Sequence, residues 1–175
     1  MQDPRPLTTE PLAIDLVNTE WIDAGERRDL LAEPGGLATW LATAGHAGAP
    51  ADAEALAALR EARAAIGAAI ARRDDAAALN AVLARGHLAE RLGPDGPERG
   101  LEVDDERWRV PWLAAQNLLE LLRAGADRIR RCAADGCILH FYDVSRPGGR
   151  QWCSMAACGN RAKARRHYRR TRGAV

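Results

Sequence analysis

The spacing of apolar residues predicts a mainly helical first part of the chain. Residues 11–22 are apolar with scattered polar positions, which favours a short helix, although a strand is also compatible. Pro34 begins a second helix that stops at Gly45, because proline is common just inside a helix and glycine just beyond it. Residues 51–72 form the clearest amphipathic helix. Its stripe consists of Leu56, Leu59, Ile66 and Ile70, with the stem of Arg63 at the edge.

A further short helix and a small β-hairpin are predicted in the middle of the chain. Asp74 can cap the helix. The apolar positions of this helix are Leu79, Val82 and Leu83. Residues 93–100 have the composition of a loop. Residues 101–103 and 108–110 then predict two short strands joined by a polar turn.

A long helix is predicted from Pro111 to Arg131. Its apolar positions are Trp112, Ala115, Leu119, Leu122, Ala126 and Ile129. About 20 helical residues measure roughly 30 Å, so we expect this rod to hold the C-terminal residues away from the body. The expected fold class is mainly α (α+β), with a helical domain over residues 1–125 and a small module over 126–175.

Charge is distributed very unevenly along the 175 residues. Residues 1–122 contain 12 arginines and 21 acidic residues, a net charge of −9, whereas residues 123–175 contain 13 basic and 3 acidic residues, a net charge of +10. A basic tail on an acidic body favours a polyanionic partner for the tail. The alternative is two solvated surfaces of opposite sign.

The sequence also predicts the cellular compartment of the protein. The first residues lack the apolar segment of a secretory signal, and no stretch has the ~18 consecutive apolar residues that span a bilayer. We therefore expect a cytoplasmic protein without a membrane partner, while the oligomeric state stays open. In a reducing compartment, paired cysteines are more often metal ligands than disulfides.

Four cysteines form two pairs with the same internal spacing. They are Cys132, Cys137, Cys153 and Cys158, two C-x4-C motifs separated by fifteen residues. Two tight turns that each supply two thiolates suit a tetrahedral zinc ion, so we expect one structural zinc per chain. Two disulfides or an iron–sulfur cluster are the alternatives, and His140 or His167 could replace a cysteine.

The expected zinc site favours a structural role over a catalytic one. Four thiolates leave no open coordination position for water, so the metal is expected to be structural. The sequence has no nucleophile–base pair, phosphate loop or open metal site. We therefore expect that the protein is not an enzyme.

The residues around the second cysteine pair predict a hairpin followed by a basic helix. In residues 138–152, an alternating strand, a turn over 146–149 and a return strand at 151–152 form the hairpin. Asn160 can cap the helix that follows. Knuckle, hairpin and helix in this order form a treble-clef-like finger.

The predicted helix has one broad cationic face on a helical wheel. A bound polyanion relieves the repulsion among the positive side chains on this face. The arginines on the face can contact phosphates or bases. Tyr168 lies on the narrow arc expected to pack on the finger. The candidate nucleic-acid contacts are Arg150, Asn160, Arg161, Lys163, Arg165, Arg166, Arg169, Arg170 and Arg172.

Several runs of residues resemble a known family. The run FYDVSRPGGRQWCSMAACGNRAKARRHYRRTR resembles the CGNR zinc finger, named for residues that match Cys158-Gly159-Asn160-Arg161 here. The runs PLAIDLVNTEW and RRDLLAEPGGLATWL resemble the ABATE domain that precedes this finger. The resemblance covers essentially the whole chain, and all four metal positions match. It implies a bacterial, stress-induced transcription regulator whose finger binds DNA.

The expected function is thus a zinc-dependent, DNA-binding transcription regulator. RNA or ribosome binding is the first alternative, because the same charges suit RNA, and a protein-interaction adaptor with a basic docking helix is the second. The N-terminal domain is a candidate sensor of a signal. Asp15, Asn18 and Thr19 in the matching motif are candidate sensing residues, although capping and buried hydrogen bonds also explain them.

Overall fold

The computed structural model describes residues 2–72 and 76–165. Within these residues the protein is mainly α-helical, with three two-stranded antiparallel sheets. This is the α+β class that the sequence predicts. None of the helices in the described part combines the length and the apolar composition that a bilayer span requires.

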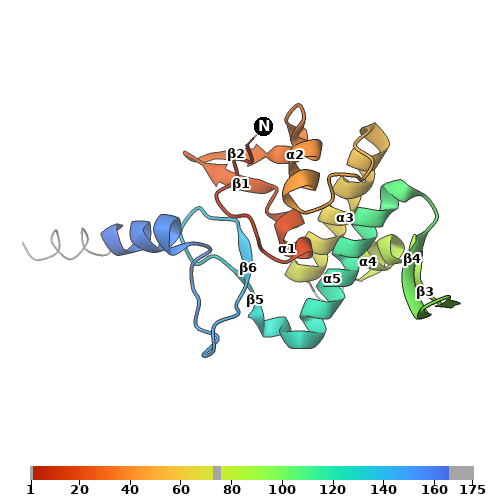
Figure 1. The fold of residues 1–175 in the computed structure, drawn as a ribbon. Coiled ribbons are helices and arrows are strands. Elements are labelled where there is room, and N and C mark those ends of the chain that lie inside the picture. The colour runs from red at the N-terminus through yellow and green to blue at the C-terminus, as the bar shows by residue number, and fades with distance from the viewer. Residues whose placement is uncertain (1, 73–75, 166–175) are drawn as a thin grey trace, which may run out of the picture.

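The elements follow one another in the order shown in Figure 1. The helices are α1 (Leu12–Val17), α2 (Gly36–Thr43), α3 (Ala53–Ala71), α4 (Ala77–Leu83) and α5 (Arg109–Gly125). The strands are β1 (Glu20–Asp23), β2 (Glu26–Asp29), β3 (Gly86–Gly93), β4 (Gly96–Val103), β5 (Ile129–Arg131) and β6 (His140–Tyr142). A π-helical turn, Met155–Gly159, leads into a helix that is described over residues 160–165.

The helices predicted from apolar spacing are present. Asp52 begins α3, because its carboxylate accepts a hydrogen bond of 2.8 Å from the backbone N–H of Ala55. Residues 11–22 contain both of the predicted alternatives, since α1 is followed directly by β1. The predicted cap at Asp74 lies outside the described residues.

The hairpin predicted at 101–110 is wrong in its position. Strand β4 does include residues 101–103, but it pairs with β3, and a two-residue turn of Pro94 and Asp95 joins them. The misplacement has a physical reason. Most of β3 and β4 is exposed, so their sequences lack a strong apolar alternation, whereas Val110 is buried and belongs to α5.

The sequence pattern did not predict the β1–β2 hairpin. Strand β2 consists of four charged residues with no buried position, so no apolar period marks it. Its turn is formed by Ala24 and Gly25, whose φ angles of 48° and 90° suit the two-residue turn that matches strand twist.

The predicted rod that holds the finger away from the body does not form. Helix α5 ends at Gly125, and Ile129 lies in β5, where it pairs with Tyr142 of β6. The apolar spacing continues past the helix end because Ile129 still packs against the core, although from a strand. The return strand predicted at 151–152 is also absent, since β5 occupies the place beside β6.

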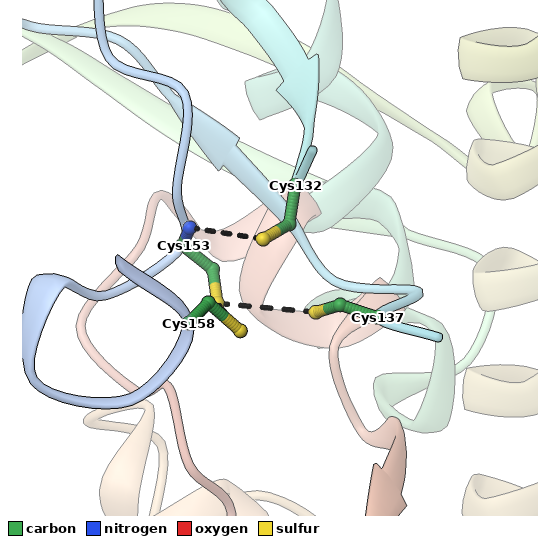
Figure 2. A group of neighbouring side chains, drawn as sticks. All are labelled: Cys132, Cys137, Cys153 and Cys158. Carbon is green, nitrogen blue, oxygen red and sulfur yellow. Dashed lines mark hydrogen bonds between the residues drawn. The ribbon is translucent and has the colours of Figure 1, made fainter. Parts of the chain in front are cut away.

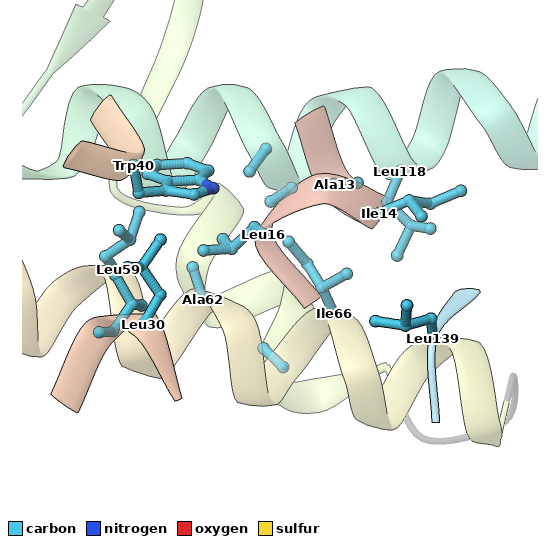
Figure 3. Packing of buried hydrophobic residues seen from close by; sticks show 14 of the residues in the cluster. Ala13, Ile14, Leu16, Leu30, Trp40, Leu59, Ala62, Ile66, Leu118 and Leu139 are labelled. Atoms are coloured by element: carbon cyan, nitrogen blue, oxygen red, sulfur yellow. The ribbon is translucent and has the colours of Figure 1, made fainter. Parts of the chain in front are cut away.

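A single hydrophobic core runs through both parts of the chain. Helix α1 packs against α3 and α5, and Ile14 and Ile66 are fully buried between them. Leu139, directly before β6, and Phe141 of β6 belong to the same cluster, and Figure 3 shows Leu139 within it. The finger is therefore built onto the helical domain.

Polar contacts hold β6 against the helical domain as well. One edge of β6 pairs with β5, and the other faces residues from the N-terminal part. The amide of Asn18 donates to the carbonyl of His140 (2.8 Å) and accepts from its N–H (2.9 Å). Glu10 accepts from the N–H of Tyr142 (2.9 Å). These two side chains satisfy backbone groups as a neighbouring strand would.

The shared core predicts that the finger and the helical domain stabilise each other. Replacing Leu139, which is 3% exposed, by alanine is expected to cost about 2–5 kcal/mol of unfolding free energy and to lower the melting temperature of the helices. Far-UV circular dichroism during thermal unfolding measures this. Leu92→Ala is the matched control, because Leu92 is 82% exposed. Equal melting curves for the two variants would contradict a common core.

Candidate metal centre and nucleic-acid interface

The four cysteines converge on one point from two turns of the chain. Cys132 follows β5 directly, and a turn through Gly136, with φ of 74°, brings Cys137 beside it. Cys153 and Cys158 come from the start and the end of the second turn (Figure 2). All four Sγ atoms lie within 4.8 Å of one another, and all four residues are buried.

This geometry fits a tetrahedral zinc ion. Zinc–sulfur bonds of about 2.3 Å place thiolates about 3.8 Å apart in a tetrahedron. The Sγ atoms of Cys137 and Cys153 are 3.9 Å apart, and those of Cys153 and Cys158 are 3.5 Å apart. Disulfides are not formed, because all four thiols are free and these distances far exceed a sulfur–sulfur bond. The cysteines form one zinc site.

The thiols perturb one another in the way that a metal site requires. A hydrogen bond from Cys153 lowers the pKa of Cys137 to about 5. The same hydrogen bond and burial raise the pKa of Cys153, while burial is the main cause that raises the pKa of Cys158. Four thiolates cannot all be ionised together in so small a space without a cation. The donor set therefore suits a divalent metal that replaces the thiol protons.

Donors from the backbone and from the basic helix surround the sulfurs. The N–H of Cys153 lies 3.4 Å from Sγ of Cys132, and the Arg161 guanidinium donates to Sγ of Cys158 at 3.1 Å. Ser154 caps the π-helical turn by accepting from the N–H of Ala157. The predicted cap at Asn160 is therefore wrong. The helix begins one turn earlier, inside the metal-binding turn, so an earlier residue receives the free N–H groups.

The first residues of the basic helix are exposed beside the zinc site. Asn160, Arg161, Lys163 and Arg165 are all exposed. Arg165 pairs with Asp135 of the first turn at 3.3 Å. Lys163 has no hydrogen bond or ion pair within the described residues. The remaining predicted contacts, Arg166, Arg169, Arg170 and Arg172, lie outside those residues, as do His167 and Tyr168.

Comparison with known families decides the identity of this arrangement. Residues 128–171 match the CGNR zinc finger, and residues 10–125 match ABATE, described as "putative stress-induced transcription regulator". The second match covers more than half of the chain. The protein belongs to the ABATE family and carries a CGNR zinc finger. No curated protein matches the chain.

Arg150, one of the predicted nucleic-acid contacts, holds the CGNR finger together through contacts within the protein. Its guanidinium donates to the carbonyls of Trp152 (3.0 Å) and Cys153 (2.6 Å) and to the carboxylate of Glu10 (3.0 Å). It also stacks on the ring of Phe141, 4.2 Å from the centroid. These contacts link the second cysteine turn to the ABATE domain.

The three candidate sensing residues are buried, and their side chains form hydrogen bonds within the protein. Asp15 accepts from Arg5 (2.8 Å) and from the indole of Trp40 (2.9 Å). Thr19 accepts from Arg63 (2.8 Å), and Asn18 binds β6 as described above. Their positions agree with the alternative interpretation, a role in buried hydrogen bonds. None of them lines the groove described next.

A groove of about 980 Å³ separates the β1–β2 hairpin from the CGNR finger. Its floor includes the buried side chains of Trp21, Leu30 and Leu139. The finger contributes the cysteine turns together with Arg161 and Arg165. The sequence did not predict this groove, because one of its walls is the β1–β2 hairpin, whose charged β2 strand has no apolar period.

The geometry predicts one zinc ion per chain, whose removal unfolds the finger. Cys153→Ser removes one of four ligands, and the binding energy of a structural zinc is part of the folding energy of its module. Elemental analysis should find one zinc in the natural protein and far less in the variant. Ala156→Ser, an exposed position in the same turn, should keep its zinc. Metal analysis that finds iron in the natural protein would refute a zinc site.

Arg161 is expected to strengthen zinc binding through Cys158. Groups that hydrogen-bond to metal ligands typically contribute 10–100-fold to metal affinity, so Arg161→Gln should release zinc to a chromogenic chelator at about tenfold lower chelator concentration. Lys163→Gln is the control, because it makes the same charge change without a sulfur contact. Equal zinc affinity in both variants would show that the contact at 3.1 Å is not significant.

Proposed function

We propose that this protein is a zinc-dependent transcription regulator that binds DNA through the basic helix of its CGNR finger. The observation that supports this most directly is the position of the helix. It begins within the second cysteine turn, so zinc binding orients Arg161, Lys163 and Arg165 relative to the rest of the protein. Cations on an oriented helix suit contacts to backbone phosphates.

The charge of the finger agrees with a polyanionic partner. Residues 123–175 have a net charge of +10, and of their three acidic residues Asp143 is buried. Asp135 pairs with Arg165, but both side chains are more than half exposed, so the pair is weak and easily exchanged for a phosphate. DNA supplies the negative phosphates that suit such a surface.

A structural metal and the absence of an enzymatic role are part of the proposal. Among the described residues, the four cysteines are the group of ligand side chains arranged for a metal, and they complete its shell. The zinc supplies rigidity, and the protein chain supplies the contacts. We also place the protein in the cytoplasm, where these thiols stay reduced.

Signal sensing, the second part of the proposal, is assigned to the groove. Its two walls belong to the ABATE domain and to the finger, and Arg161 and Arg165 lie on the finger wall. A ligand in the groove therefore meets the same side chains that DNA is proposed to meet. Addition of duplex DNA should change amide hydrogen exchange in β1–β2 as well as in residues 153–165. Unchanged exchange in β1–β2 would contradict this coupling.

Salt dependence of binding tests the helix contact. If about five phosphates are neutralised, log affinity against log salt should have a slope of about −4.5 for duplex DNA. The double variant Lys163→Gln/Arg165→Gln should make this slope shallower by up to about two units. Fluorescence anisotropy of a labelled duplex measures both. Arg91→Gln/Arg99→Gln is the charge-matched control, because both side chains are exposed on the distant β3–β4 hairpin (Figure 1).

The outcomes separate the proposal from its alternatives. Equal loss of slope in the two double variants would mean that only net charge matters. Tighter binding to structured RNA than to duplex DNA at equal salt would favour RNA or ribosome binding. Wild-type affinity in the Lys163/Arg165 variant, with zinc retained, would favour the adaptor with an acidic protein partner.

A further inference from the structure

The loop at residues 143–150, which follows β6, is held rigidly by two arginines. The Arg128 guanidinium donates to the carbonyls of Asp143 (2.7 Å) and Ser145 (3.1 Å). Arg130 donates to the carbonyls of Gly148 (2.8 Å) and Arg150 (3.2 Å). The two side chains extend from the segment around β5 and bind the loop at both of its ends.

A buried carboxylate holds the same loop from within. Asp143 is 0% exposed and accepts from the N–H groups of Ser145 and Arg150, each at 2.9 Å. The Ser145 side chain first, and then these two N–H groups and the charge of Arg130, lower the pKa of Asp143 to about 2. The turn is closed by Gly148, whose φ of 63° favours glycine and whose N–H donates to the Ser145 carbonyl.

The rigid loop presents an apolar and a cationic side chain to solvent. Val144 is 79% exposed, although its backbone is held in place on both sides. Arg146 is exposed and makes no hydrogen bond or ion pair within the described residues. Rigid presentation lowers the entropy cost of binding a partner.

We propose that the loop 143–150 is a second DNA-contacting element, in which Arg146 binds a backbone phosphate and Val144 packs against the sugars of the same strand. The inference rests on the proposed function and extends it to a surface outside the basic helix. The loop and the helix lie at the same end of the molecule, opposite the β3–β4 hairpin (Figure 1).

The surroundings of the loop favour a polyanion over a protein partner. The two side chains that hold it, Arg128 and Arg130, are cations, and its one acid is buried and bound by backbone N–H groups. The exposed surface is therefore positive and repels a second copy of itself. A phosphate–sugar strand offers both the negative charge for Arg146 and an apolar edge for Val144.

Two variants test the two contacts separately in the full-length, zinc-loaded protein. Arg146→Gln should make the slope of log affinity against log salt shallower by about one unit on duplex DNA. Val144→Thr keeps the shape of the side chain but replaces a methyl group by a hydroxyl. It should weaken binding by up to about fourfold at every salt concentration, the value of one buried methyl group, and leave the slope unchanged. Arg91→Gln controls for the loss of one charge.

The outcomes distinguish this inference from the proposed function. If Arg146→Gln keeps the natural slope while the Lys163/Arg165 double variant loses slope, the loop is not a DNA contact and the helix still is. If the natural protein does not bind duplex DNA at all, both proposals fail. A reduced slope for Arg146→Gln on RNA but not on duplex DNA would also overturn the inference. A loss of about one unit that the Arg91→Gln control does not show supports it.

Discussion

The arrangement of this protein depends on how one edge of strand β6 is satisfied. A strand edge that is removed from water must find partners for its N–H and C=O groups. Here the Asn18 amide and the Glu10 carboxylate provide them from the ABATE domain. Because Asn18 is fully buried, loss of this pairing would leave backbone groups unpaired in the interior. The contact therefore sets the position of the finger on the domain.

Zinc binding and the ABATE domain are connected through the same edge. Glu10 also pairs with Arg150, which in turn donates to the carbonyl of Cys153, a metal ligand. The side chains are 9% and 29% exposed, so this pair is better shielded from solvent than the ion pairs on the surface. A shift of the ABATE domain would move a zinc-binding turn and the helix that begins in it. This connection is a physical route from the ABATE domain to the basic helix, which we propose contacts DNA.

The sequence predicted the structure correctly where interactions between neighbouring residues determine it. The two C-x4-C motifs identified the zinc ligands, because four soft ligands in two tight turns have few other uses. Apolar spacing located α3, which has seven buried positions. The same reasoning misplaced the β3–β4 hairpin and did not detect β1–β2. Both hairpins are mostly exposed, and an exposed strand needs no apolar alternation.

The metal, the main helices, the family and the separation of charge between the two parts of the chain are evident from the amino-acid sequence alone. Each of these follows from residue types at short spacing. The contact of Arg161 with Cys158 is local, but it depends on the zinc-binding turn, which apolar spacing does not describe. Three further features required the folded chain: α5 ends at Gly125, β5 lies beside β6, and Arg150 is an internal link. They depend on contacts between residues far apart in the chain, such as Glu10 with Arg150, for which local periodicity has no signal.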